Sequence, residues 1–400
     1  MKAVEIKENV FWVGVLDPTL VVFDIVIPTE HGTTYNAYLV KGKEKTALID
    51  TVKEPFKEEY LNLIGTIIDP KEIDYIVINH TEPDHSGALP YLYDFVPNIT
   101  PVYSRTAKTF VSSILHKEFN PIVVGDGDKI DLGGKTLSFV TAPFLHWPDT
   151  MFTYLEEDKI LFPCDAFGAH YCSEQRFNDE IEERDVVHAA FEYYYKCILR
   201  PFKDHIVRAM EKIKDLDIDI IAPSHGPILR ANVPDYIEDY KKWAYNAKDP
   251  SVKKKISILY VSSYGNTAKM AKSIARGAVL PGVEISLYNV TEVPLDKIID
   301  EVEISDGIII GTPTLNAKTP EPIFDIISKL VTLNVKGKAA AVFGCYGWSG
   351  EAIQMTEDIL KSFKFKIIVG SCKLKLVPTE EELKQCEEFG RTYVKTLLEK

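Results

Sequence analysis

Runs of hydrophobic residues follow different patterns in the two parts of the chain. After residue 255, five short runs are almost continuously apolar, which is typical of parallel strands covered on both faces. These runs are ISILYV, VEISLYNV, GIIIGTPT, AAAVFG and FKIIVGS. Segments with helical spacing, such as residues 267–278, separate them. The alternation predicts a doubly wound parallel α/β sheet for residues 251–400.

The first 250 residues show many short strand-like segments with helical stretches interspersed. The strand-like segments include FWVGVL, GTTYNAYLV, TALIDTV and DYIVINH, and residues 192–214 have helical spacing. This pattern predicts a mixed sheet layered with helices. Between the two parts the chain becomes polar and basic and contains the helix breaker Asp249-Pro250. We therefore expect two domains, 1–250 and 251–400.

Composition narrows the class of protein and the kind of partner. Of 400 residues, 46% are hydrophobic and 26% charged, so we expect folded domains and no long disorder. A formal net charge of −13 gives no basic surface for nucleic acid, and a basic protein is the better expected partner. No apolar run reaches the roughly 20 residues that cross a bilayer, and a signal-peptide pattern is missing at the N-terminus. The sequence thus predicts a cytoplasmic protein without membrane contact.

The six cysteines are scattered along the chain and form no CxxC pair. We therefore expect reduced, mostly structural thiols and no rubredoxin-like or zinc-ribbon site.

Residues 79–87, NHTEPDHSG, contain four groups that bind metals, directly after the apolar run YIVI. The four are His80, Glu82, Asp84 and His85. The alternative is structural, with Asp84 capping a helix that runs from Ser86 and Glu82-Pro83 forming the turn before it. This stretch alone does not decide between metal binding and helix capping.

Three further candidate ligands each follow a strand-like run. His146 follows TLSFVTAP, Asp165 follows KILFPC, and His225 follows DIDIIAPS. Strand ends on one edge of a sheet converge in space, so we expect these residues to meet NHTEPDHSG. Four imidazoles and three carboxylates exceed the needs of one tetrahedral ion, which predicts two metals bridged by Asp165. Oxygen and imidazole ligands without thiolate admit iron, manganese or zinc and favour the harder ions.

The other histidines and one tyrosine carry weaker signals. His31, His116, His188 and His205 follow no such run and are expected at the surface or hydrogen-bonded in the core. His170, six positions after Cys164, is a candidate proton donor near the site. Tyr195, in the run YYY, is a candidate for a supporting catalytic role, with core packing as the alternative.

Three glycine-containing loops follow three strands of the second part. The first, between a strand and a helix, offers hydroxyls and backbone N–H groups for a phosphate, but it lacks the GK[ST] ending of a Walker loop and the GxGxxG pattern. Such loops meet where a doubly wound sheet reverses its strand order. The aromatic residues of the third loop are candidates to flank a planar ring, and turn glycines with packing aromatics are the alternative. The candidate residues are Ser262, Ser263, Tyr264, Gly265, Asn266 and Thr267; Thr312, Pro313, Thr314, Leu315, Asn316 and Ala317; and Cys345, Tyr346, Gly347, Trp348 and Gly350.

Taken together, these motifs resemble those of the flavodiiron proteins over nearly the whole chain. The resemblance rests on HxExDH with His146, Asp165 and His225, and on SSYGNT, GTPTLNA and FGCYGWSGEA. It implies an α+β, metallo-β-lactamase-like αββα sandwich with a non-haem diiron site, followed by an α/β, flavodoxin-like domain that binds FMN. Tyr264 stands where a tryptophan is often found in the family.

By position, the resemblance implies a role for each metal-binding residue. His80, Glu82 and His146 would bind one iron, Asp84, His85 and His225 the other, and Asp165 would bridge them. Some family members leave the histidine at the position of His85 off the metal. Zinc hydrolases of this fold typically have HxHxDH, and the carboxylate of Glu82 in place of the middle imidazole favours iron and redox chemistry.

The resemblance also implies an activity and partners. The family reduces dioxygen to water or nitric oxide to nitrous oxide, as a detoxification in anaerobes, with electrons from the irons and the flavin. Electrons would come from a rubredoxin, a reductase or a reduced deazaflavin coenzyme, and the subunits would form a head-to-tail homodimer or a dimer of dimers. Two alternatives remain: a zinc hydrolase with an appended flavodoxin domain, and an electron-carrier module.

Overall fold

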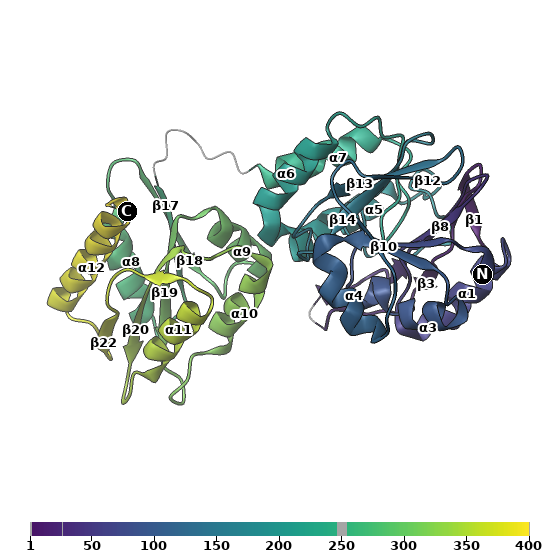
Figure 1. Cartoon of the computed structure of the whole chain (residues 1–400). Helices are drawn as coiled ribbons and strands as arrows, with labels where there is room; N and C mark the ends of the chain where they lie inside the picture. Colours follow the sequence, from purple (N-terminus) through teal and green to yellow (C-terminus); the bar gives the residue numbers. More distant parts are fainter. Residues whose placement is uncertain (1, 26, 246–253, 400) are drawn as a thin grey trace. The chain divides into compact units, whose positions relative to one another are not determined.

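The computed structural model describes residues 2–25, 27–245 and 254–399, which form two compact units (Figure 1). One unit extends to Tyr245 and the other begins at Lys254. The domain boundary expected between residues 250 and 251 lies outside the described residues.

The first unit contains two main β-sheets that pack face to face. In the first sheet, the neighbours among β1, β2, β7 and β8 pair antiparallel, and the neighbours among β8, β9, β10 and β11 pair parallel. It is therefore the expected mixed sheet. Its order is β1 (Val4–Lys7), β2 (Val10–Trp12), β7 (Tyr38–Lys41), β8 (Thr46–Ile49), β9 (Tyr75–Ile78), β10 (Thr100–Ser104) and β11 (Ile122–Val124).

The second sheet is shorter and mostly antiparallel. Its order is β12 (Lys129–Asp131), β13 (Thr136–Thr141), β14 (Met151–Leu155), β15 (Ile160–Phe162) and β16 (Ile220–Ile221). Two small pairs lie beside the main sheets: β3 (Val15–Asp17) with β6 (Thr33–Tyr35), and β4 (Val22–Phe23) with β5 (Ile27–Pro28). The run FWVGVL is split between β2 and β3. Between these strands the chain passes close to Tyr35, and a Cβ added at Gly14 would lie 2.3 Å from the Tyr35 carbonyl oxygen.

Helices cover the outer faces of the two sheets and complete an αββα sandwich (Figure 1). On the side of the first sheet lie α1 (Lys57–Gly65), α3 (Leu89–Phe95) and α4 (Lys108–Leu115); on the side of the second lie α5 (Arg184–Tyr194), α6 (Lys203–Ile213) and α7 (Val233–Ala244). The helical stretch expected over 192–214 is helical but is interrupted between α5 and α6. A π-turn at Tyr195–Leu199 and a 3-10 turn at Arg200–Phe202 separate α5 from α6, since Pro201 has no N–H to continue an α-helix.

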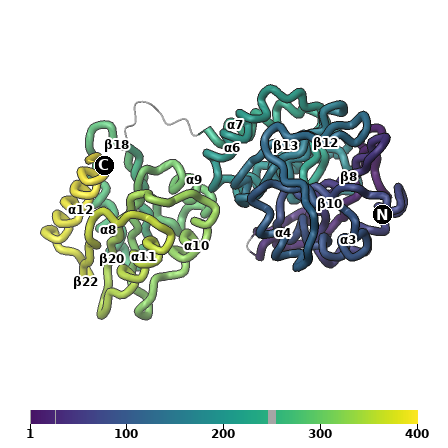
Figure 2. Tube along the Cα trace, viewed as in Figure 1, coloured from purple at the N-terminus to yellow at the C-terminus, as the bar shows by residue number. Residues whose placement is uncertain are grey.

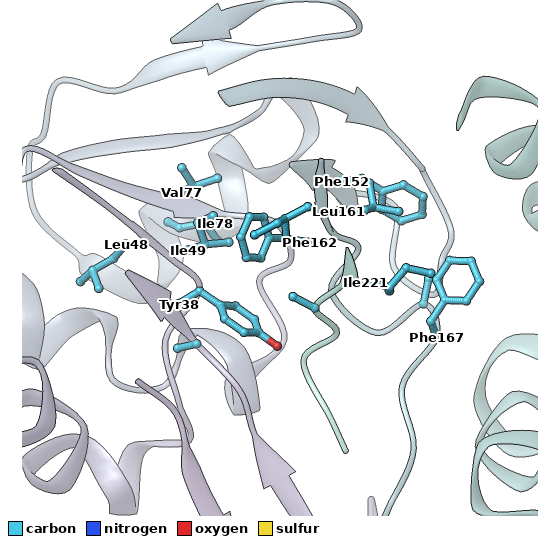
Figure 3. Close-up of a cluster of buried hydrophobic side chains, with 14 of the residues drawn as sticks. Tyr38, Leu48, Ile49, Val77, Ile78, Phe152, Leu161, Phe162, Phe167 and Ile221 are labelled. Carbon is cyan, nitrogen blue, oxygen red and sulfur yellow. The ribbon is translucent and has the colours of Figure 1, made fainter. Parts of the chain in front are cut away.

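Apolar side chains from both sheets fill the space between them (Figure 3). The rings of Tyr38 on β7 and Phe162 on β15 lie 5.0 Å apart, centroid to centroid. The Tyr38 hydroxyl also donates a hydrogen bond of 2.6 Å to the carbonyl oxygen of Pro223. The core thereby fixes the chain on both sides of the sandwich just before Asp165 and His225.

The second unit is a parallel sheet with helices on both faces. The strand order is β18 (Val283–Asn289), β17 (Lys254–Tyr260), β19 (Gly307–Pro313), β20 (Ala339–Tyr346) and β21 (Lys366–Ile367), with β22 (Cys372–Lys375) also beside β20. One face packs against α8 (Asn266–Ala278) and α12 (Glu380–Leu398), the other against α9 (Leu295–Ile304), α10 (Glu321–Lys329) and α11 (Glu351–Ser362) (Figure 2). This is the doubly wound sheet expected from the apolar runs. Its order reverses at β17, so a ligand crevice is expected at the carboxyl ends of β17 and β19.

Within the described ranges, none of the helices combines the length and apolar character required to span a bilayer.

Candidate functional site

The loop after β9 presents the first ligands at the edge of the sandwich. Its backbone is held at Asn79, whose N–H donates to Asp50 Oδ1 (2.8 Å) and whose Oδ1 accepts from Thr153 Oγ1 (2.7 Å). The short helix α2 (Pro83–Ser86) follows, with Glu82 at its N-cap position but with no cap hydrogen bond from that side chain. The alternative in which Asp84 caps a helix from Ser86 is therefore wrong. The Glu82 carboxylate is instead directed to neighbouring histidines.

A first group of candidate ligands gathers around Glu82. Glu82 Oε2 lies 3.1 Å from His80 Nε2 and 2.8 Å from His146 Nε2. Asp165 Oδ2 lies 3.4 Å from the same nitrogen of His80 and 3.5 Å from that of His146. The distances place two imidazoles and two carboxylates around one point, as a metal site of three protein ligands and a bridge requires.

A second group lies on the other side of Asp165. Asp84 Oδ2 is 3.1 Å from His225 Nε2, and Asp84 Oδ1 is 3.4 Å from His85 Nε2. Asp165 Oδ1 faces both histidines, at 2.9 Å from His85 Nε2 and 3.5 Å from His225 Nε2. One oxygen of Asp165 thus faces each group, which is the geometry of a bridging carboxylate. All seven predicted ligands are brought together.

Several buried atoms in these groups have no hydrogen-bond partner. They are both carboxylate oxygens of Asp84, Oδ2 of Asp165 and Nε2 of His225. An unsatisfied buried polar atom costs about 1–3 kcal/mol, and more for a charged group. Metal ions would satisfy these atoms, so the residues present fit a two-metal site on their own chemistry.

Protonation in the absence of metal shows how strongly the carboxylates act on the imidazoles. Burial alone would lower the pKa of His80, but its hydrogen bonds to Asp149 and Glu82 raise it to about 9. Burial would also lower the pKa of His146, but its hydrogen bonds to Asp165 and Glu82 raise it to about 10. The pKa of Asp165 is held well below its ordinary value against the effect of burial, chiefly by His85. The carboxylates of both groups therefore favour positive charge at this place, as a site for metal cations requires.

Residues around the ligands hold the imidazole rings in place. His80 Nδ1 lies 3.4 Å from Asp149 Oδ1, and the other oxygen of Asp149 accepts from the Thr81 N–H (2.9 Å). His225 Nδ1 lies 2.6 Å from the carbonyl oxygen of Thr34. Such partners orient metal-binding histidines and fix their tautomer. Asp149 was not predicted from the sequence, although it follows His146 by three residues.

The two candidate catalytic residues have different surroundings. His170 is buried beside the second group, with its ring 5.5 Å from that of His225 and its Nδ1 3.0 Å from Thr33 Oγ1. Burial, followed by the charge of His225, holds the pKa of His170 well below its ordinary value. The ring of Tyr195 packs instead against Tyr240 and Trp243.

The neighbour of Tyr195 contacts the bridging carboxylate. The hydroxyl of Tyr194 donates a hydrogen bond of 3.0 Å to Asp165 Oδ1. We expect Tyr194→Phe to lower metal affinity or turnover by about 10–100-fold, the usual effect of removing a hydrogen bond to a ligand. Tyr195→Phe keeps its ring contacts and serves as the matched control. Metal content and steady-state turnover of both variants measure the difference; equal loss in both would contradict this assignment.

Two further residues at the site carry no clear sequence signal. Cys164 lies close enough to His85 and Asp165 to share a metal-binding group with them, and its Sγ accepts a hydrogen bond from Ser224 Oγ at 3.2 Å. Asp24 lies on the hairpin between β4 and β5, next to Phe23, whose ring is 4.3 Å from that of His170. Desolvation, then the charges of Glu82 and Asp84, raise the pKa of Asp24 to about 6.

The four histidines expected outside the site belong to neither ligand group in the described part of the chain. His188 Nε2, for example, lies 2.9 Å from Asp239 Oδ2 on the surface, and the ring of His205 packs on Phe144.

In the second unit, the three candidate loops follow the adjacent strands β17, β19 and β20. The second and third loops are joined by the Thr314 N–H, which donates to the Cys345 carbonyl oxygen at 3.3 Å. In the first loop, the Ser262 hydroxyl accepts a hydrogen bond of 3.1 Å from the Ala268 N–H in the first turn of α8. All three loops therefore lie at one edge of the sheet.

The loops leave room and unsatisfied groups for a bound molecule. Gly265, the N-cap residue of α8, has φ 81°, and an added Cβ would meet no atom within 4 Å. The buried hydroxyl of Thr314 has no hydrogen-bond partner. Tyr264 and Trp348 are 91% and 76% exposed, so both rings are free to cover a planar ligand. These residues fit a phosphate at the helix N-terminus and a flat ring between the loops.

Comparison with known families defines the class of protein. Residues 33–226 match the family described as "ODP family beta lactamase", and residues 258–390 match the flavodoxins. The chain is thus a metallo-β-lactamase-like domain followed by a flavodoxin domain, as the sequence predicted.

Relatives with the same two domains identify the family. The chain is 41% identical to the Flavo-diiron protein FprA2 of Clostridium acetobutylicum, over 99% of this chain and 100% of the relative. It is 37% identical to a protein of Moorella thermoacetica named nitric oxide reductase, over 97% of each chain. The solved rubredoxin oxygen:oxidoreductase of Desulfovibrio gigas is 30% identical and superposes with a TM-score of 0.73, covering 100% of this chain and 99% of that one. The chain belongs to the flavodiiron protein family.

Proposed function

We propose that this protein is an oxidoreductase that reduces dioxygen to water, nitric oxide to nitrous oxide, or both, with two non-haem irons and FMN. The observation that carries the proposal is Asp165, whose two oxygens face the two ligand groups. The relatives from Moorella and Desulfovibrio, named for nitric oxide reduction and for oxygen oxidoreduction, support the two gases as substrates. Removal of dioxygen or nitric oxide in an anaerobe is the role that fits this activity.

The seven candidate ligands would bind the two irons in the two groups that their distances define. His80, Glu82 and His146 would hold one iron, and Asp84, His85 and His225 the other, with Asp165 shared. We include His85, since its Nε2 lies 2.9 Å from Asp165 and faces Asp84. When bound, the irons and the flavin would supply the electrons for the reduction.

Residues around the ligands keep the reacting space ordered and dry. Thr33 Oγ1 lies 3.0 Å from His170 Nδ1 and 3.4 Å from His225 Nδ1, so one hydroxyl orients both rings. We assign His170 as a neutral imidazole with its unpartnered Nε2 available to hold or pass a proton. Phe23 packs over both rings and excludes water from that side.

The three loops after β17, β19 and β20 (the flavin loops) give a prediction that separates the two cofactors. Gly265→Val should remove FMN while metal content stays unchanged, because φ 81° strains any L residue with a Cβ and the new side chain would occupy the space in front of α8. Flavin absorbance and metal analysis of the purified variant measure this. Gly127→Val, also at φ 81° with open space around it but in the first unit, is the matched control. Loss of metal together with FMN from Gly265→Val would contradict the separation.

Exposed apolar residues near both sites support a head-to-tail homodimer. Val21, Val22 and Ile25 are exposed on the hairpin that carries Asp24. In the second unit, the flavin loops and the segment after β22 also carry exposed apolar residues. These are Tyr264, Leu315, Trp348, Leu376 and Val377. Solvent-exposed apolar groups of this kind mark interaction surfaces, and a closed two-fold dimer is the commonest assembly. We propose that these exposed residues of the flavin loops of one subunit dock on the hairpin between β4 and β5 of the other subunit. The assembly would be a dimer or a dimer of dimers.

Charge placed in either patch should weaken that dimer. Ile25→Asp and Trp348→Asp should each raise the fraction of monomer in sedimentation velocity and slow flavin reoxidation by gas, since a charged group in an apolar interface must be desolvated. Val279→Asp, at a residue 66% exposed beyond the end of α8, is the control. A wild-type protein that sediments as a fully active monomer would contradict the dimer.

The electron donor and the competing functions are tested together by anaerobic turnover. Each gas is supplied to the protein with a reduced rubredoxin, a flavin reductase or a reduced deazaflavin coenzyme. Fast gas consumption with one donor supports the oxidoreductase. Zinc in the isolated protein with esterase or thioesterase activity would support a hydrolase, and slow, substoichiometric flavin oxidation would support an electron carrier.

A further inference from the structure

A pair of cysteines lies in the second unit, on β22 and α12. Cys372 is the first residue of β22, and Cys386 lies on the inner face of α12. Their Sγ atoms are 3.8 Å apart, although fourteen positions separate them in sequence. Both are free thiols in the structure. The distance is a van der Waals contact, so small side-chain rotations would bring the sulfurs within bonding range.

The two thiols differ in access and in acidity. Cys386 is fully buried in the cluster between α8, α12 and the sheet, whereas Cys372 is partly exposed. The hydrogen bond from Cys386 lowers the pKa of the Cys372 thiol, and the same contact raises that of Cys386. A partly exposed thiol of lowered pKa with a second thiol in contact is the arrangement of a cysteine pair that reacts with oxidants.

Free cysteines usually pack as small apolar groups with a weak S–H donor. Here each of the two thiols has the other as its side-chain hydrogen-bond partner. The segment after Cys372 is attached to the third flavin loop, because the Leu376 N–H donates to the Tyr346 carbonyl oxygen at 2.9 Å and Cys345 Sγ donates to the Leu376 carbonyl oxygen at 3.0 Å. A covalent bond between the pair would therefore join α12 to β22, the strand that lies beside this loop.

We propose that Cys372 and Cys386 form an oxidant-sensitive dithiol that hydrogen peroxide converts to a disulfide. The Cys372 thiolate attacks one peroxide oxygen; with one proton taken up, a sulfenic acid and one water form. The Cys386 sulfur then attacks the sulfenic sulfur, the S–O bond breaks, and the thiol proton leaves with the hydroxyl as a second water. Both thiols together lose two electrons, and the peroxide gains them.

Peptide mapping of the full-length, cofactor-loaded protein tests this proposal. Trypsin cleaves after Lys366, Lys373, Lys384 and Arg391, so Cys372 and Cys386 fall in separate peptides, 367–373 and 385–391. After anaerobic treatment with about equimolar hydrogen peroxide, we expect these peptides to be joined by a bond that dithiothreitol reverses. Untreated protein should yield both peptides free.

Variants identify the order of attack. Cys386→Ser should accumulate sulfenic acid at Cys372, trapped as a dimedone adduct, whereas Cys372→Ser should give neither the adduct at Cys386 nor the linked peptides. Cys172→Ser, at a partly exposed free cysteine of the first unit, should form the linked peptides as the wild type does. Absence of the linked peptides from peroxide-treated wild type, or a dimedone adduct on Cys386 in place of Cys372, would overturn the proposal.

Discussion

Asp165→Ala should abolish gas reduction, lowering turnover by about three orders of magnitude or more, and should leave FMN bound. The reason is the double role of this carboxylate. Its Oδ2 faces His80 and His146 and its Oδ1 faces His85 and His225, so its removal takes a ligand from both groups at once. It also leaves buried imidazoles without their shared counter-charge, and removal of one partner of a buried ion pair typically costs about 3–5 kcal/mol.

Three measurements on this variant separate loss of the site from loss of the fold. Metal content should fall, flavin absorbance should persist, and far-UV circular dichroism should match the wild type. Asp165→Asn, which keeps the shape without the charge, should show the same loss of turnover. Asp217→Ala, which removes an exposed carboxylate paired with Lys159, is the control and should change neither metal nor turnover. Full turnover in Asp165→Ala would end the two-metal assignment.

Glu82→Gln should lower turnover by about 100-fold and deplete iron from the group of His80 and His146. Glu82 Oε2 lies 3.1 Å from His80 Nε2 and 2.8 Å from His146 Nε2, and an amide at this position has the same size but no charge. In the metal-free protein Glu82 helps to raise the pKa of both histidines, so in the variant their pKa values should fall.

The pKa change gives this second prediction a readout that does not depend on activity. Histidine titrations by NMR in the metal-free variant should show His80 and His146 losing their protons at lower pH than in the wild type. Glu211→Gln, at an exposed residue paired with Lys214, provides the matched control. Unchanged titrations and full iron content in Glu82→Gln would show that Glu82 does not act on this group.

Local sequence was enough to predict that the seven candidate ligands lie together, because each of them follows a strand or lies at the start of the helix after it. His80, His146, Asp165 and His225 come from strands far apart in sequence, yet parallel and antiparallel pairing brings their ends to one edge of the sandwich. The same logic placed the three flavin loops after adjacent strands. Strand ends are readable from the sequence since apolar runs stop there.

The choice between Tyr194 and Tyr195 could not be made from the sequence. Helical spacing from the buried Phe191 reaches both, at i+3 and i+4, and both tyrosines are buried. The chain leaves α-helical geometry at Tyr195, where the π-turn begins, and the turn directs Tyr194 to Asp165 and Tyr195 to Trp243. The amino-acid composition of an apolar segment does not indicate where an α-helix changes to a π-turn.

Contacts made by irregular segments were also beyond prediction. Asp24 comes near the carboxylates of Glu82 and Asp84 on a hairpin of two-residue strands, and Cys372 meets Cys386 only because β22 lies against α12. Neither contact follows from periodicity or from spacing along the chain. Both depend on the three-dimensional path of the polypeptide.

The most direct test of the account is an anaerobic titration of the fully reduced protein with dioxygen. With two ferrous ions and a reduced flavin per chain, about one dioxygen per chain should reoxidise both cofactors, without release of hydrogen peroxide. Rapid-scan absorbance and a peroxide assay follow the reaction. Consumption of about two dioxygen molecules per chain with release of peroxide, or oxidation of the flavin while the metal stays reduced, would contradict a diiron centre that reduces the gas.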